Sequence, residues 1–354
     1  MKTNSRQGLA AWLGAGAIAL ALSGAAFAEP EFKDGKLQPL ADGFPNRAIT
    51  LINVDDPGTR DGIYARSLQE ALRSISPVDV LVSDEPSPAY GTFFTVQDVG
   101  GREGGNEGYY PIIMTIPGGS ADILVEPITA DTGLTLDDLN LVIGTERIPY
   151  VLIQKKDAPW GKTFASLVEH IKANPGKVKY ISHQVGTGND LAMSWIIQQL
   201  GLEVNKVPAP TDPQVGAIVG AGEGDFSLAQ ADIALNAWQS GRVDVVMVTG
   251  DTVPAPWADD ENVVSATEAG LPPAPFGLYL GFVVPKAVPA AHVEWLHALL
   301  KAAAESEVHQ KRKDVIPGLT FAIIGPEEAN KVKTDIVAFL DPVVRALGMH
   351  IDDR

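Results

Sequence analysis

The 354-residue chain contains no cysteine. Disulfides, zinc–thiolate sites and thiol nucleophiles are therefore excluded, and stability must come from a buried core. Walker, GxSxG and HExxH motifs are also missing, and Gly186-x-Gly188 lacks the third glycine of a dinucleotide fingerprint. After residue 28 no apolar run is long enough to predict a membrane helix.

Positive charge is scarce, with 27 Lys and Arg against 44 Asp and Glu. Removal of Lys2 and Arg6 with a predicted leader leaves 25 basic residues against 44 acidic ones, a net charge of −19. Such a surface repels nucleic acid and anionic membranes, so we expect no nucleic-acid partner. An anionic ligand would have to be captured locally, by backbone amides and helix ends.

Catalytic groups are sparse as well. Of the six histidines, four fall on predicted helices, and His292 and His297 are five residues apart, which does not place two ligands on one helix face. No nucleophile with a base and no metal cluster is apparent. We therefore predict a protein that is not an enzyme and needs no cofactor or metal. An exported hydrolase is the catalytic alternative, and it would require turnover that is lost on changing Asp225 or His183.

The N-terminus has the pattern of a secretory signal peptide. Lys2 and Arg6 precede an apolar run over 9–22, and Ala26-Phe27-Ala28 supplies a cleavage site. We expect cleavage after Ala28 and a soluble, exported protein. The remaining 326 residues (354 minus 28) are enough for two domains.

Strands and helices alternate along the chain, which predicts α/β architecture with helix-covered, mostly parallel sheets. Two units have the same order of a strand, a glycine-bearing turn and a helix. In the first, a strand over 48–54 leads into a helix over 63–75, with Asp61 as the N-cap and Ile63 facing inward. In the second, a strand over 178–182 leads into a helix that follows 184–189.

A helix N-terminus behind a glycine turn presents amide groups to an anion. For the second unit alone, an ordinary turn with an Asn or Thr N-cap fits as well. Open α/β sheets bind ligands beyond the carboxyl ends of their strands, so two such lobes would hold a ligand in the cleft between them. The polar lead-in over 29–44 is expected to be loosely attached.

Several segments resemble one known family. They are Phe44–Thr50 (FPNRAIT), Pro175–Tyr180 (PGKVKY), Ala266–Pro272 (ATEAGLP), Tyr279–Pro285, Pro289, Gly325–Glu328 (GPEE) and Arg345–Gly348 (RALG). Together they are similar to the periplasmic solute-binding receptors of tripartite tricarboxylate transporters, also called Bug receptors. The resemblance covers about residues 44–349.

The resemblance implies a two-lobed periplasmic-binding-protein (clamshell) fold with the ligand in the interlobe cleft. Its expected organisation is a signal peptide at 1–28, a lead-in at 29–44, lobe 1 at 45–146 plus 252–354, and lobe 2 at 147–251. In this family two glycine-bearing loops, one from each lobe, act as pincers that hold a carboxylate. Carried over by position, the expected ligand-binding residues are Asp55, Pro57, Gly58, Thr59, Arg60, Ser182, His183, Val185, Gly186, Thr187, Asp225 and Phe226.

Some of these positions depart from the family pattern. Thr59 stands at a usual glycine, while His183 and Gln184 stand where a small residue and a glycine are common. Arg60 could clamp a carboxylate or be a solvated loop cation, and His183 could contact ligand or bond locally. Asp225 could receive a ligand amine or hydroxyl, or cap the next helix.

By resemblance, the protein is expected to capture a small carboxylated organic solute, a di- or tricarboxylate or an aromatic acid. It would act as a monomer and deliver the solute to the membrane permease subunits of a tripartite transporter. The alternative is a periplasmic ligand sensor that presents its closed form to a signalling partner.

Overall fold

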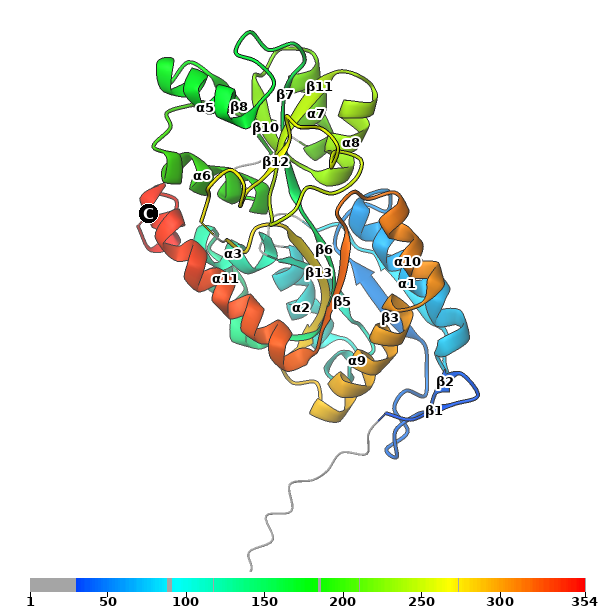
Figure 1. The fold of residues 1–354 in the computed structure, drawn as a ribbon. Coiled ribbons are helices and arrows are strands. Elements are labelled where there is room, and N and C mark those ends of the chain that lie inside the picture. Colours follow the sequence, from blue (N-terminus) through cyan, green and yellow to red (C-terminus); the bar gives the residue numbers. More distant parts are fainter. Residues whose placement is uncertain are drawn as a thin grey trace, which may run out of the picture.

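The computed structural model of the chain describes residues 30–87, 91–116, 118–183, 186–209, 211–272 and 274–353. The predicted signal peptide, together with Gln184 and Val185 of the second glycine turn, lies outside these residues. The described chain forms two lobes, each built on a six-stranded sheet covered by helices (Figure 1). The two-lobed α/β architecture predicted from the sequence is confirmed.

The first sheet has the strand order β14-β6-β13-β5-β3-β4. Its strands are β3 (Ile49–Asn53), β4 (Val80–Asp84), β5 (Ile112–Ile116), β6 (Leu139–Ile148), β13 (Leu278–Pro285) and β14 (Thr320–Ile324). The helices of this lobe are α1 (Arg60–Ile75), α2 (Gly91–Gly101), α3 (Gly118–Val125), α4 (Ile128–Thr132), α9 (Ala290–Ala304), α10 (Glu307–Gln310) and α11 (Pro326–Ala346). Short 3₁₀ turns lie at Gly105–Glu107, Leu136–Asp138, Lys311–Asp314 and Ile351–Asp353.

The second sheet has the order β12-β11-β7-β10-β8-β9. Its strands are β7 (Tyr150–Lys155), β8 (Lys179–His183), β9 (Asn205–Ala209), β10 (Phe226–Gln230), β11 (Val243–Val248) and β12 (Val264–Ser265). Its helices are α5 (Phe164–Ala173), α6 (Gly188–Leu200), α7 (Asp212–Gly220) and α8 (Ala231–Gln239). The lobe boundaries given above stay a prediction.

Both sheets are mixed, which corrects the expectation of mostly parallel sheets. In the first sheet β13 runs antiparallel to both β5 and β6, and in the second β7 runs antiparallel to both β10 and β11. Each of these strands enters its sheet directly from the other lobe, so it runs against the strands that belong to local strand–helix–strand units. Helical periodicity and strand propensity carry no information on this direction.

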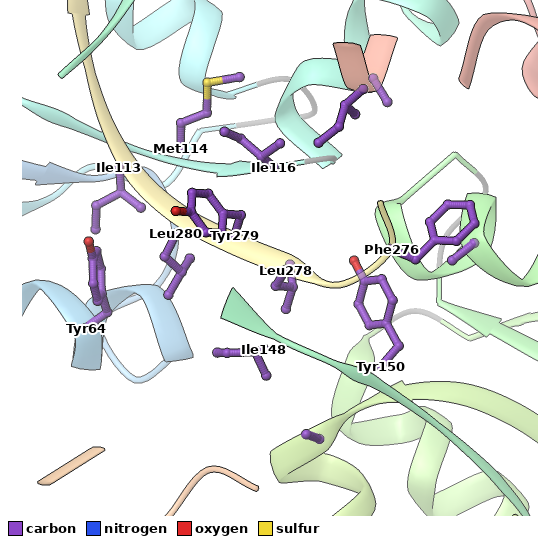
Figure 2. Packing of buried hydrophobic residues seen from close by; sticks show 14 of the residues in the cluster. Tyr64, Ile113, Met114, Ile116, Ile148, Tyr150, Phe276, Leu278, Tyr279 and Leu280 are labelled. Atoms are coloured by element: carbon purple, nitrogen blue, oxygen red, sulfur yellow. The ribbon is translucent and has the colours of Figure 1, made fainter. Parts of the chain in front are cut away.

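The chain passes between the lobes at two places that we call the crossover, Ile148–Tyr150 and Phe276–Leu278. Leu278 pairs with Ile148, and Thr249 donates its backbone N–H to the Tyr150 carbonyl at 2.8 Å. Tyr150 and Leu278 are buried side by side with the core of the first sheet (Figure 2). The crossover is therefore packed into a hydrophobic core that continues through both lobes.

Two segments differ from the sequence expectation. The lead-in forms a short hairpin of β1 (Phe32–Lys33) and β2 (Lys36–Leu37), and Leu37 is fully buried. The indole N–H of Trp295 donates to the Gln38 carbonyl at 2.7 Å, so this segment is fixed to the lobe. Helix α3 was not predicted because it begins with Gly118-Gly119, which have low helix propensity.

Candidate functional site: two strand-to-helix loops

The first loop connects β3 to α1 and is held by Asn53, a side chain that is fully buried at the end of β3. Its amide Nδ2 donates to the Asp55 carbonyl and to Oδ1 of Asp84, each at 2.8 Å. Its Oδ1 accepts the Asp55 backbone N–H at 3.2 Å. Asn53 fixes the start of the loop, and the sequence patterns did not single it out.

Helix α1 is capped by Thr59, not by Asp61 as predicted. The Thr59 hydroxyl accepts the Gly62 N–H, and the Thr59 carbonyl accepts the Ile63 N–H at 3.0 Å. Asp61 instead accepts Nη2 of Arg60 at 2.9 Å. Helix α1 begins three residues earlier than expected, and Ile63 faces solvent with 54% exposure instead of facing inward; Tyr64 and Leu68 lie on the buried face.

Arg60 links the two lobes. Its Nη1 donates to Oε1 of Gln230, which ends β10 in the second sheet. The Arg60 side chain is only 13% exposed and also pairs with Asp61, so it is not a solvated loop cation. Asp55, Pro57 and Gly58 are exposed. The first loop thus faces the second lobe with a guanidinium at its far end.

The second loop connects β8 to α6. Gly186 adopts a φ of +90°, which favours glycine, and a Cβ there would lie 3.4 Å from Cγ2 of Val125 in α3. The Thr187 hydroxyl donates to the His183 carbonyl at 2.7 Å. At Gly186 the second loop therefore lies against a helix of the first lobe. Val185, a predicted site residue, lies outside the described residues.

Asp190 organises this loop from inside. Its carboxylate is fully buried and accepts the Ser182 hydroxyl at 2.6 Å and the Gly186 N–H at 3.0 Å. Lys206 of β9 donates Nζ to the same carboxylate at 2.6 Å. Two predicted ligand-binding groups, the Ser182 hydroxyl and the Gly186 amide, are therefore engaged by the protein's own carboxylate. An acid in the first turn of the helix is the signal that could have indicated this role.

Asp225 and Phe226 are not brought to the two loops. Phe226 begins β10 and pairs in parallel with Tyr180, so the opposite end of β10, Gln230, lies towards the second loop. Asp225 instead bonds Nζ of Lys155 at 2.7 Å and the Lys179 N–H at 2.8 Å. Phe226 is fully buried and stacks on Tyr180. The direction of β10 therefore places Asp225 and Phe226 at the end of the strand away from the second loop.

Helix α3, which contacts the second loop through Val125, also carries Asp122. Burial, and to a smaller extent the nearby Glu126, raise the pKa of Asp122 to about 7. The helix packs against α6 and α11. Near neutral pH, Asp122 is thus partly protonated and can donate a hydrogen bond as well as accept one.

No group of three or more His, Cys, Asp or Glu within the described ranges is arranged to hold a metal ion. In the same part of the chain, no helix combines the length and apolar character needed to cross a membrane.

The fold and the facing loops define a two-lobed periplasmic-binding-protein architecture. Residues 64–314 match the model of the tripartite tricarboxylate transporter family receptor, and the chain belongs to this family. The family consists of solute-binding receptors and not of enzymes. The resemblance stated from the sequence is confirmed.

Individual relatives agree with this assignment. A UPF0065 protein of Bordetella pertussis is 26% identical over 267 residues, covering 75% of this chain and 78% of that protein. The structure of the periplasmic binding protein BugD has a TM-score of 0.69 at 20% identity, covering 87% and 99% of the two chains. The R. palustris protein Rpa4515, solved with adipate, has a TM-score of 0.69 at 18% identity, covering 86% and 98%.

Proposed function

We propose that the protein captures a small carboxylated organic solute between the two loops, in the periplasm, and delivers it to the permease subunits of a tripartite transporter. The observation that carries the proposal is the interlobe contact between Arg60 and Gln230. It shows a cation of the first loop reaching the second lobe at the carboxyl end of β10. Adipate, the ligand of a protein with the same fold, is a dicarboxylate, which supports this class of solute.

Arg60 is the proposed carboxylate clamp. A guanidinium can hold a carboxylate through two parallel hydrogen bonds, and this cation is pre-oriented by Asp61. Asp55, Pro57, Gly58 and Thr59 of the first loop and His183, Val185 and Thr187 of the second complete the proposed site. The N–H groups of Asp55 and Thr59 already donate to Oδ1 of Asn53 and to the Asp56 carbonyl, so Gly58 is the amide donor that we propose in the first loop. Proline carries no N–H, so Pro57 contributes shape only. Asp225 and Phe226 are left out because they lie at the other end of β10.

The hydrogen bonds from Ser182 and Gly186 to Asp190 limit which groups of the second loop could bind a solute. Both groups keep the loop in shape and are not available as simple donors. The solute would therefore depend mainly on Arg60 and on the remaining amides. Di- and tricarboxylates and aromatic acids remain the proposed solutes, and a monomer is the proposed state.

A thermal-shift screen tests the proposal. Adipate, succinate, citrate and benzoate are compared with amino acids and sugars, because a ligand that binds only the folded state raises the melting temperature by mass action. At a ligand concentration of 100 times Kd the stabilisation is about 2.7 kcal/mol. Stabilisation by sugars or amines, with none by any organic acid, would overturn the carboxylate assignment.

The variant Arg60→Gln tests the clamp. Loss of a charge-assisted contact should weaken binding of the stabilising acid about tenfold to a hundredfold. Arg73→Gln is the matched control, since Arg73 is an exposed arginine in the last turn of the same helix. Equal affinities of the two variants would rule out the role of Arg60. Delivery to a permease is tested separately, by solute uptake in cells that carry or lack this receptor.

A further inference from the structure

A cavity of about 790 Å³ lies beside the crossover. Arg147, Asp251, Thr252 and Phe276 are among the residues that line it. This volume is within the range of about 300–1,000 Å³ that is typical of small-molecule sites. Figure 2 shows Phe276 next to Tyr150, where the chain passes between the lobes.

The cavity is separate from the two loops. None of its lining residues belongs to 55–62 or to 182–189. Its walls come instead from the end of β6 and the start of β14, at the β14 edge of the first sheet, and from the end of β11, near the β12 edge of the second sheet. The proposed solute loops follow β3 and β8, on the other side of the crossover strands.

Arg147 is the cation of this cavity. Among the described residues, its guanidinium makes no hydrogen bond and no ion pair. Its backbone lies in β6 between Tyr279 and Thr320, and its carbonyl also accepts the Thr320 hydroxyl at 3.4 Å. The side chain passes over the crossover, with Nε 3.8 Å from the position that a Cβ of Gly277 would occupy. No carboxylate of the described residues pairs with Arg147, so an anionic ligand would not have to displace one.

The other residues of the cavity wall restrict the charge of the ligand that Arg147 could bind. Asp251, whose carboxylate already accepts the Thr267 hydroxyl at 2.9 Å, is the one acid among the described lining residues. One cation and one acid favour a ligand with a single negative charge, because a second carboxylate would be repelled by Asp251. Phe276 and the prolines at 149, 254 and 275 present apolar surface, and Thr252 adds a hydroxyl group. The hydroxyls of Thr249 and Thr320 are instead bonded to Tyr150 and to the Arg147 carbonyl.

We propose that the crossover cavity is a second binding site, for a small monocarboxylate with an apolar or aromatic body, and that Arg147 binds its carboxylate. The apolar walls take the body of the ligand, and the Thr252 hydroxyl takes a polar substituent. The assignment does not depend on the identity of the solute in the cleft.

Calorimetric titration of the mature protein with benzoate tests this site, with citrate as the polyanionic counter-probe. Arg147→Gln should weaken one benzoate-binding component about tenfold to a hundredfold, because a charge-assisted contact is lost. Lys313→Gln removes the same charge from an exposed position away from the cavity and should leave the titration unchanged. Citrate binding should not respond to Arg147→Gln.

The variant Arg60→Gln distinguishes the two sites, because a benzoate-binding component that this variant loses belongs to the cleft and not to the crossover cavity. The proposal is overturned by a benzoate titration that is the same in wild type and Arg147→Gln, by the absence of any benzoate binding, or by loss of all binding in Arg60→Gln. Arg147 is exposed, so the variant should fold, and an unchanged melting temperature without ligand verifies this.

Discussion

Replacement of Glu146 by glutamine should strongly destabilise the first lobe. Glu146 lies on β6 with a fully buried side chain, and its carboxylate accepts Nε and Nη2 of Arg312 at 2.6 and 3.0 Å. Nε2 of His309 lies 2.9 Å from Oε1, at ion-pair distance. Arg312 is itself only 6% exposed. The carboxylate therefore neutralises a cation that water cannot reach.

The expected cost follows from that burial. Removing one partner of a buried ion pair typically costs about 3–5 kcal/mol, because the other charge stays buried without a counterion. For a unit of about 150–250 residues, each kcal/mol lowers Tm by about 2–4 °C, so a fall of about 6–20 °C is expected. Glu305→Gln is the control: Glu305 forms an exposed pair with Lys301, and its loss should cost less than about 1 kcal/mol.

The effect should depend on pH. Burial by itself would raise the pKa of Glu146, but the contacts with His309 and Arg312 outweigh it and hold the pKa below its usual value. A carboxyl with a depressed folded pKa stabilises the protein above its unfolded pKa of about 4.3, and that contribution is lost as pH falls through the folded pKa. The difference between wild type and Glu146→Gln should therefore be largest near pH 7 and shrink in acid.

Urea unfolding followed by circular dichroism, at neutral pH and in acid, measures this. The double variant Glu146→Gln/Arg312→Met should recover part of the loss, since it removes the stranded cation. A cost below about 1 kcal/mol at pH 7, or no recovery in the double variant, would refute the reasoning.

Two further outcomes are expected. The variant Asp122→Asn should be more stable than wild type at pH 8, by up to about 4 kcal/mol, and nearly equal to it at pH 4. The reason is that ionisation of a carboxyl with a raised folded pKa destabilises the folded protein as pH rises to about 7. Urea unfolding at both pH values measures this, and a stability difference that is the same at pH 4 and pH 8 counts against it. Asp190→Ala should leave the Gly186 N–H and the Ser182 hydroxyl without their acceptor, costing about 1–3 kcal/mol each, and speed hydrogen exchange of the second loop. Unchanged exchange at Gly186 would count against that role of Asp190.

The local elements were largely predictable. A strand, a glycine turn and a helix around 48–75 and 178–200 follow from periodicity and turn chemistry, and both units are present as β3–α1 and β8–α6. Errors arose where local signals were weak or ambiguous. Asp61 is as good an N-cap type as Thr59, so the sequence could not choose between them.

The candidate site was predictable in part. Arg60 was identified as a residue to watch, but its partner Gln230 is 170 positions away and carries no motif. Asp225 was carried over from a family position, and only the parallel pairing of β10 with β8 shows which end of the strand approaches the second loop.

By itself, the sequence determined the chemistry of the chain: its acidic charge, its lack of cysteine, its predicted leader, its strand–turn–helix units and the motifs of its family. The tertiary structure decided which groups meet. It brings Arg60 to Gln230, directs Asp190 to the amide of its own loop, buries Glu146 against Arg312, and leaves Arg147 beside a cavity at the crossover. The physical reason is that these pairings depend on the path of the chain between two sheets, whereas local propensities act over only a few neighbouring residues.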